Sequence, residues 1–235
     1  MCVAVGLKPR RAAKEITKKT LRLCWDENPH GAGFMFVSDN KVLIEKGFFD
    51  FDEFFDTLML ARELHPDSWF GVHFRIASAG VISADNCHPF WIKEGEMAVI
   101  HNGTIQGLPG VSKDSAESDT CVFARDILAK LPDGFLENEA IRELIEDRIG
   151  YSKLFVLTAD NRVFIYNENA GVWINGNWFS NTRWKPKPKK EELKIVWNDK
   201  RASRNFSATE AIAISKKHKT AKARGFVDFT KTRRF

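Results

Sequence analysis

Residues 68–80, SWFGVHFRIASAG, join a strand pattern to a polar segment that ends in glycine. Aromatic and β-branched residues dominate positions 69–74, which is typical of a buried strand. His73, Arg75 and Ser78 then follow within six residues and bring polar side chains to the end of that strand. The stretch therefore predicts a strand over 68–74 and a polar loop directly after it.

Further strands and helices are expected on both sides of this stretch. Turn-forming residues at 38–40, 160–161 and 175–176 separate neighbouring strand candidates, which indicates a hairpin-rich, largely antiparallel system. The other expected strands are 2–6, 33–37, 41–47, 97–101, 153–158, 162–167 and 172–174. Helical patterns cover 10–24, 52–64, 119–130 and 139–148. This mixture predicts a layered α+β domain.

Length and composition fit one well-buried domain, or one domain with an appendage. The chain has 235 residues, of which 43% are hydrophobic and 29% charged, and it holds 19 Phe and 7 Trp, so disorder of the whole chain is excluded. No apolar run reaches about 18 residues, and the first apolar stretch precedes its charges, unlike a secretory signal. The four cysteines, at 2, 24, 87 and 121, form no C-x-x-C pair. We expect reduced thiols and a cytoplasmic location.

The net charge of +5 is unevenly distributed along the chain. Residues 1–184 hold 20 Lys and Arg against 26 Asp and Glu, whereas residues 185–235 hold 16 against 5. The Lys/Pro stretch RWKPKPKKEE at 183–192 reads as a linker. It divides a domain at 2–184 from a basic extension at 185–235, in which a capping box at 207–210 predicts a helix to about residue 224. The extension is expected to bind nucleic acid or an acidic partner and no membrane, or else to serve only as a solvated tail.

Cys2 is the first residue whose position indicates a specific chemical role, that of a nucleophile. Removal of the initiator Met would leave a thiol and a free α-amine on one Cα. An α-amine titrates at about 7.7–8.0, so it is able to take the thiol proton near neutral pH without a histidine. Taken alone, however, this signal is weak, because a Cys at position 2 is more often simply the start of a buried strand, here the one expected at 2–6.

Four short motifs follow Cys2 in a fixed order. They are H-x-R-x-A-S/T-x-G at 73–80, N-x-H-P at 86–89, H-N-G at 101–103 and S-D-T at 118–120. The ordered set resembles the class II glutamine amidotransferases of the N-terminal nucleophile hydrolase superfamily. NPHGAG at 28–33 and WFSNT at 178–182 extend the resemblance, which covers about residues 2–184 and leaves the basic extension outside.

The resemblance implies a four-layer αββα sandwich and a catalytic group of three residues. Cys2 is the implied nucleophile on the side-chain amide of glutamine, and the Asn102 amide and the Gly103 N–H are the implied oxyanion hole. An Asn-Gly pair also has a plainer interpretation, because it is a leading hairpin-turn signal. No metal or organic cofactor enters this mechanism.

Three further residues are implied to bind the substrate. Glutamine carries a carboxylate and an ammonium at one end, so its site needs a cation and an anion. Arg75 is implied to bind the α-carboxylate in a bidentate fork and Asp119 to accept from the α-ammonium, while Ser78 takes the place of a family Thr. The alternatives are a structural ion pair for Arg75 and a helix-starting cap for Asp119. His73, His88 and His101 are expected to be orienting or core residues.

The chain departs from the family pattern at Ala79, at His30 and at Glu27, which leaves the branch open. No second domain that accepts ammonia and no nucleotide-binding glycine pattern is visible. We therefore expect a stand-alone glutaminase that supplies ammonia to a separate synthase. The alternatives are an amidohydrolase of a γ-glutamyl compound without ammonia transfer, and an inactive module that binds nucleic acid.

Overall fold

The computed structural model describes residues 2–186, which contain two antiparallel sheets and four α-helices. The six-stranded sheet has the order β3-β2-β4-β1-β10-β9, and the four-stranded sheet has the order β5-β6-β7-β8. The strands of the first are β1 (Val3–Leu7), β2 (Ala32–Ser38), β3 (Lys41–Phe48), β4 (Phe70–Phe74), β9 (Val172–Ile174) and β10 (Asn177–Phe179). Those of the second are β5 (Phe90–Lys93), β6 (Met97–Asn102), β7 (Lys153–Thr158) and β8 (Val163–Tyr166). The expected mixed, antiparallel α+β architecture is confirmed.

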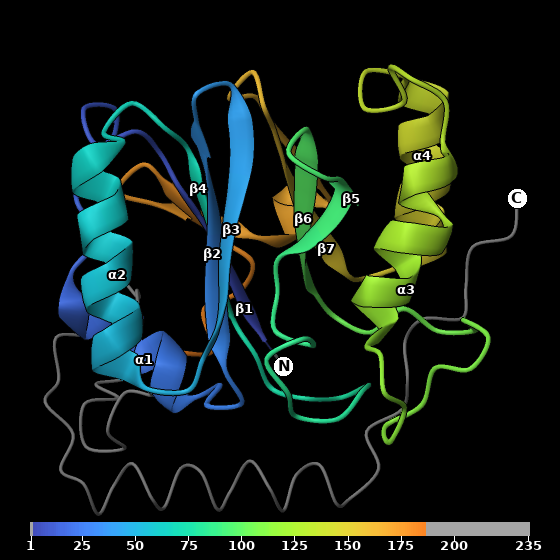
Figure 1. Ribbon diagram of the computed structural model, residues 1–235, viewed down its shortest axis with the longest axis horizontal. Coiled ribbons are helices and arrows are strands. Elements are labelled where there is room, and N and C mark those ends of the chain that lie inside the picture. The colour runs from blue at the N-terminus through green and yellow to red at the C-terminus, as the bar shows by residue number, and fades with distance from the viewer. Residues whose placement is uncertain (1, 187–235) are drawn as a thin grey trace, which may run out of the picture. The chain divides into compact units, whose positions relative to one another are not determined.

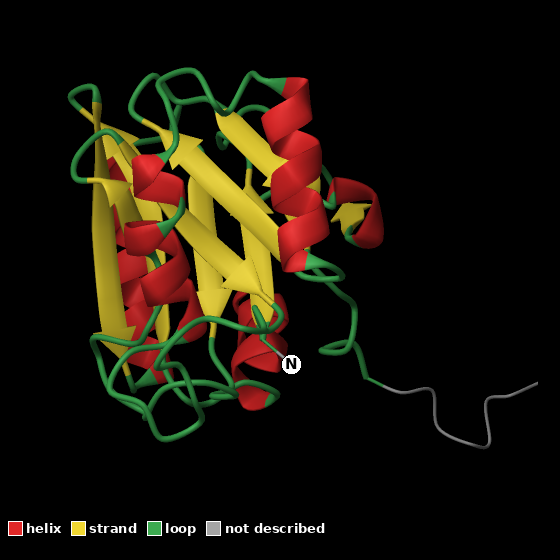
Figure 2. Ribbon diagram, turned by 90° about the vertical axis from the view of Figure 1, so that its right-hand side faces the viewer, coloured by secondary structure: helices red, strands yellow, loops and turns green. Residues whose placement is uncertain are grey.

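The helices lie on the outer faces of the two sheets (Figure 1). α1 (Lys18–Asp26) and α2 (Phe51–Leu64) cover the six-stranded sheet, and α3 (Asp119–Asp126) and α4 (Glu139–Ile149) cover the other. Two 3₁₀ turns, Leu128–Lys130 and Glu168–Ala170, complete the described elements. Figure 2 shows long loops gathered at one end of the strands.

The expected helix at 10–24 is wrong over its first half. α1 begins only at Lys18, after Thr17 accepts a hydrogen bond from the N–H of Thr20 at 3.2 Å. Upstream, the N–H of Arg10 donates to Pro66 O at 2.8 Å, and that of Lys14 donates to Asn175 O at 3.2 Å. Distant segments satisfy these donors, and the N–H of Lys14 is therefore not available to bond the Arg10 carbonyl in a helix that starts at residue 10.

Other helix and strand boundaries agree more closely with the sequence. α2 begins after Asp50, which accepts from the N–H of Glu53, and α4 begins after Asn138 in the same manner. The expected helix at 119–130 is divided at Ile127 into α3 and a 3₁₀ turn. β5 and β10 were not expected. Residues beyond 186, including most of the expected linker and the helix at 207–224, lie outside the described part of the chain.

Three apolar cores separate the layers. One lies between α1, α2 and the six-stranded sheet, and another lies between α3, α4 and the four-stranded sheet. The third, the inter-sheet core, lies between the two sheets and comprises Ala4, Met35, Val42, Ala98, Ile100, Phe155, Leu157, Ile165 and Trp178. Because both faces of the central strands are buried, β1 and β4 are buried at every position.

Phe155 of β7 packs between the two sheets and joins them. Its ring lies against Gly6 of β1 and Gly71 of β4, which are partners in the strand register. A Cβ atom at Gly6 would overlap the Phe155 ring, and one at Gly71 would lie 2.6 Å from the Met35 side chain and 3.1 Å from the ring. The ring also stacks on Trp178 at a centroid distance of 6.2 Å. The two glycines form a slot that lets the sheets approach closely.

The slot leads to a stability prediction. Phe155→Ala should lower the free energy of unfolding by about 3–5 kcal/mol, because it removes a fully buried ring and leaves a cavity. Gly6→Ala should also destabilise, by about 1–3 kcal/mol through overpacking, and by less in a Phe155→Leu background. Urea denaturation measures these values, with Phe164→Ala on edge strand β8 as the half-buried control. Equal losses of unfolding free energy in Phe155→Ala and Phe164→Ala would contradict this role of the Phe155 ring between the sheets.

Candidate active site

The alternation of side chains along the strands directs the expected nucleophile into the space between the sheets. In β1, Val3, Val5 and Leu7 belong to the core under α1 and α2, so Ala4 and Gly6 face the four-stranded sheet. One further step of the alternation places Cys2 on this inner face.

The same alternation of side chains places two other expected residues on the inner face, as it does Cys2. In β4, Val72 and Phe74 face the helices, so Arg75 continues the inner-facing series of Gly71. In β6, Ala98 and Ile100 belong to the inter-sheet core, so Asn102 is inner-facing as well. The loops after β4 and β6 lie at the same end of the sheets (Figure 1). Residues distant in sequence thus meet at one end of the inter-sheet space.

The Cys2 thiol lies against the loop after β4. It accepts from the N–H of Ile76 and lies within donating distance of Ile76 O, each at 3.3 Å, and the residue is 7% exposed. Burial raises the pKa of the Cys2 thiol, whereas the Ile76 N–H and the charge of Arg75 act in the opposite direction. A base must therefore take the proton if this thiol is to act as a nucleophile at neutral pH.

Arg75 organises the loop that it precedes. Its Nη1 donates to Val81 O at 3.1 Å, and its Nη2 donates to the carbonyl oxygens of Ala79 and Gly80, each at 3.0 Å. Within residues 2–186 these bonds leave one Nη1–H and the Nε–H without a partner. The guanidinium is buried and shapes the loop, and its charge acts on the Cys2 thiol.

Asn102 and Gly103 form the corner at the end of β6. The Asn102 side chain is 1% exposed, and its Nδ2 donates to Ser180 Oγ at 2.7 Å. Gly103 has a φ of +150°, and a Cβ atom there would collide with the Ser152 side chain, so the position requires glycine. The next regular element is α3, so the Asn-Gly pair does not form a hairpin turn.

Asp119 and Ser78 hold the loops that surround this corner. Asp119 is the first residue of α3, and its carboxylate accepts from the N–H of Ile105 at 2.7 Å and from that of Thr120 at 2.8 Å. It thereby fixes the loop that follows Gly103. The Ser78 hydroxyl is exposed and pairs with that of Thr104 at 3.1 Å, which joins the two loops.

Three buried histidines lie near the same corner. His73 and His88 lie with ring centroids 3.9 Å apart, and His101 bonds Thr120 Oγ1 through Nδ1 at 2.8 Å. Burial lowers the pKa of His73 to about 3, that of His101 to about 4, and that of His88 well below its ordinary value. The expectation that these are core or orienting residues agrees with their complete burial.

Two residues of the site were given no role from the sequence. Ser180 follows β10, is fully buried, and accepts from the Ala4 N–H at 2.9 Å as well as from Asn102. Asn181 donates through Nδ2 to Cys2 O at 2.8 Å. The WFSNT motif contained both residues, and its position after the last strand was the only available signal.

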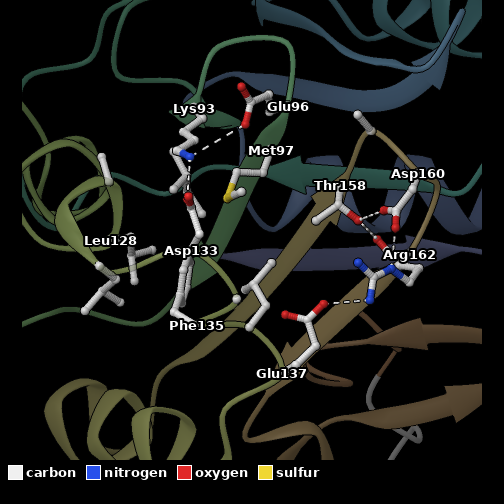
Figure 3. A pocket seen from close by; sticks show the side chains of 16 residues that line it. Lys93, Glu96, Met97, Leu128, Asp133, Phe135, Glu137, Thr158, Asp160 and Arg162 are labelled. Atoms are coloured by element: carbon white, nitrogen blue, oxygen red, sulfur yellow. Dashed lines mark hydrogen bonds and ion pairs between the residues drawn. The ribbon is translucent and has the colours of Figure 1, made fainter.

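One cavity lies away from this corner, at the opposite end of β6 and β7. It has a volume of about 340 Å³, and its walls include Met97 at the start of β6 and Thr158 at the end of β7 (Figure 3). Its two cations are already paired, Lys93 with Asp133 at 2.9 Å and Arg162 with Glu137 at 2.7 Å. The cavity therefore has no part in the site around Cys2.

No group of three or more His, Cys, Asp or Glu side chains in residues 2–186 is arranged to hold a metal ion. Over the same residues, no helix combines the length and apolar character needed to cross a membrane.

Comparison with known proteins gives one consistent group of relatives. No family model matches the chain. The chain is 29% identical over 186 residues to glutamine–fructose-6-phosphate aminotransferase (isomerizing) of Pyrococcus horikoshii, which covers 74% of this chain and 30% of the relative. The corresponding proteins of Bacillus anthracis and Staphylococcus aureus strain Mu50 are each 28% identical, over 179 and 177 residues, and each match covers 71% of this chain and 28% of the relative. The chain thus spans less than a third of the length of these relatives.

The histidine cluster predicts a loss of stability in acid. The rings are neutral in the folded chain, but in the unfolded chain each binds a proton near its ordinary pKa of 6.5. Stability is therefore complete above pH 6.5 and is lost as the pH falls from there towards 4, by up to about 1.4 kcal/mol per pH unit for each ring. Urea denaturation between pH 7 and 5 should show a shallower dependence for His73→Gln. The partly exposed His65 provides the control variant, His65→Gln, and an unchanged slope in His73→Gln would contradict the assignment.

Proposed function

We propose that the chain is a class II glutamine amidotransferase of the N-terminal nucleophile type. In this proposal it hydrolyses the side-chain amide of glutamine through Cys2 and supplies ammonia to a separate synthase. The observation that carries the proposal is the convergence of Cys2, Arg75 and Asn102 at one end of the inter-sheet space. The relatives support the substrate, because their name combines glutamine with an amino transfer.

The proposed reaction begins with loss of Met1, which frees the α-amine of Cys2. That amine takes the thiol proton, and the sulfur forms a bond to the amide carbon of glutamine. The carbonyl oxygen becomes an oxyanion, which accepts from the second Nδ2–H of Asn102 and from the Gly103 N–H. This base is necessary because burial raises the pKa of the Cys2 thiol.

Collapse of the oxyanion breaks the carbon–nitrogen bond. The α-ammonium of Cys2 returns its proton to the leaving nitrogen of the substrate, so ammonia departs and a thioester to Cys2 remains. The amine then takes a proton from a water molecule that attacks the thioester carbon. The carbon–sulfur bond breaks, the sulfur regains a proton, and glutamate leaves.

The substrate's α-carboxylate and α-ammonium are assigned to Arg75 and Asp119. Arg75 retains two N–H groups beyond its loop contacts, and the Asp119 oxygens keep lone pairs beyond their two backbone donors. Ser78, on the exposed rim, is assigned a contact to the bound substrate. In this proposal both charged residues act twice, first by shaping a loop and then by binding the substrate.

The nucleophile is tested by substitution. Cys2→Ala should reduce glutamine hydrolysis to background, because it removes the proposed nucleophile, whose thiol lies against the loop after β4. Release of glutamate and ammonia measures the activity, and circular dichroism checks the fold. Cys121→Ala, which removes a half-buried thiol on α3, is the matched control and should keep wild-type turnover. Retained turnover in Cys2→Ala would exclude the assignment, and turnover of γ-glutamyl amides without glutamine would favour the amidohydrolase alternative.

The basic extension is proposed to bind the synthase partner or nucleic acid associated with it. It carries 16 Lys and Arg against 5 Asp and Glu, which attracts polyanions in a salt-sensitive manner. Truncation after Trp184 should leave glutamine hydrolysis unchanged and should weaken binding to a polyanion such as heparin at low salt. Equal binding by the full and the truncated chain would show that the extension is only a solvated tail.

A further inference from the structure

Ser180 occupies an unusual position between the two sheets. It is fully buried directly after β10, and its N–H donates to Ala4 O at 2.9 Å. Its Oγ accepts both from the Ala4 N–H at 2.9 Å and from Asn102 Nδ2 at 2.7 Å. One hydroxyl therefore joins the strand that begins after Cys2, in the six-stranded sheet, to the end of β6 in the four-stranded sheet.

The Asn102 carboxamide depends on this hydroxyl for its orientation. Its Oδ1 is buried and has no hydrogen-bond partner among the described residues, so the bond from Nδ2 to Ser180 is the one side-chain hydrogen bond there that holds the carboxamide in place. The terminal torsion of asparagine is broad and nearly two-fold, so a carboxamide without a fixed partner is free to exchange the two groups. Only the nitrogen is able to donate to an oxyanion.

The neighbouring residue extends the connection to the nucleophile. Asn181 Nδ2 donates to Cys2 O at 2.8 Å, and Asn181 Oδ1 accepts from the Arg183 N–H at 3.0 Å. Consecutive residues therefore contact the main chain of Cys2 and the side chain of Asn102. This segment fixes the distance between the two groups that must act on the same carbonyl.

We propose that Ser180 is a positioning residue for the oxyanion hole. It holds the Asn102 carboxamide so that one Nδ2–H is engaged by Ser180 and the other faces the carbon that Cys2 attacks. This inference rests on the proposed function and adds a residue that acts through Asn102. Because the oxyanion forms only after attack, Ser180 should affect kcat more than the KM for glutamine.

A matched serine, Ser68, distinguishes a purely structural role of Ser180 from the proposed positioning role. Ser68 is also buried, and its Oγ accepts from the Val37 N–H at 2.8 Å, which parallels the bond from Ser180 to Ala4. Ser68 lies before β4, at the end of that strand opposite Arg75. Ser68→Ala thus removes a comparable backbone acceptor without touching the Asn102 corner.

The experiment measures kcat and KM for glutamine in the full-length wild type and four variants: Ser180→Ala, Ser68→Ala, Asn102→Ala, and the double variant of positions 180 and 102. We expect Ser180→Ala to lower kcat by about 10- to 100-fold, somewhat less than the roughly 10²- to 10³-fold loss on removing an oxyanion donor. KM should change by less than about threefold, and Ser68→Ala should keep wild-type kcat. The double variant should be no slower than Asn102→Ala alone, because Ser180 acts through Asn102.

Three results would overturn the proposal or its basis. A Ser180→Ala kcat equal to that of Ser68→Ala, or additive losses in the double variant, would refute the positioning role while glutamine turnover by the wild type stands. A wild type without glutamine turnover would refute the proposed function itself, and the role of Ser180 with it. If Ser180→Ala does not fold, Ser180→Cys keeps a similar shape with a weak acceptor and should show the same selective loss of kcat.

Discussion

The ring of Phe155 enters the slot between Gly6 and Gly71, and this contact sets how closely the two sheets approach. With Ala4, these glycines make the inner face of the six-stranded sheet unusually shallow around β1. A single hydroxyl, that of Ser180, is therefore able to bond both sheets at once. Larger side chains at these positions would separate the sheets and break that bridge.

The site follows from this close approach. Cys2, Arg75 and Asn102 are inner-facing because side chains alternate along the strands. Cys2 precedes β1, whereas Arg75 follows β4 and Asn102 ends β6, so the three residues meet at one end of the inter-sheet space. The loops beyond them are held by internal contacts, such as the bonds from Arg75 to the carbonyl oxygens after β4 and the bond from the Ile105 N–H to Asp119. The residues proposed to bind substrate thus also hold the loops around the Asn102 corner, so substrate binding and loop order are expected to be coupled.

Local sequence patterns predicted most of the framework, because strands such as β3 and β7 carry their signals within a few residues. β10 was not among the expected strands although the turn at 175–176 was recognised, because its three residues form a short strand that pairs with β9 across that turn and with the distant β1 on its other side. The start of α1 was misplaced because Arg10 and Lys14 donate to carbonyl oxygens of distant segments. The role of Ser180 depends on which face of each sheet meets the other, and a one-dimensional pattern does not contain that information.

The central claim is that Cys2 becomes the chain's terminal residue and attacks glutamine. Intact-mass spectrometry before and after treatment with an electrophilic glutamine analogue, followed by peptide mapping, tests it most directly. The account predicts a purified chain lighter by one methionine and a single adduct, located on Cys2. A chain that retains Met1, or an adduct on Cys121 with Cys2 unmodified, would contradict it.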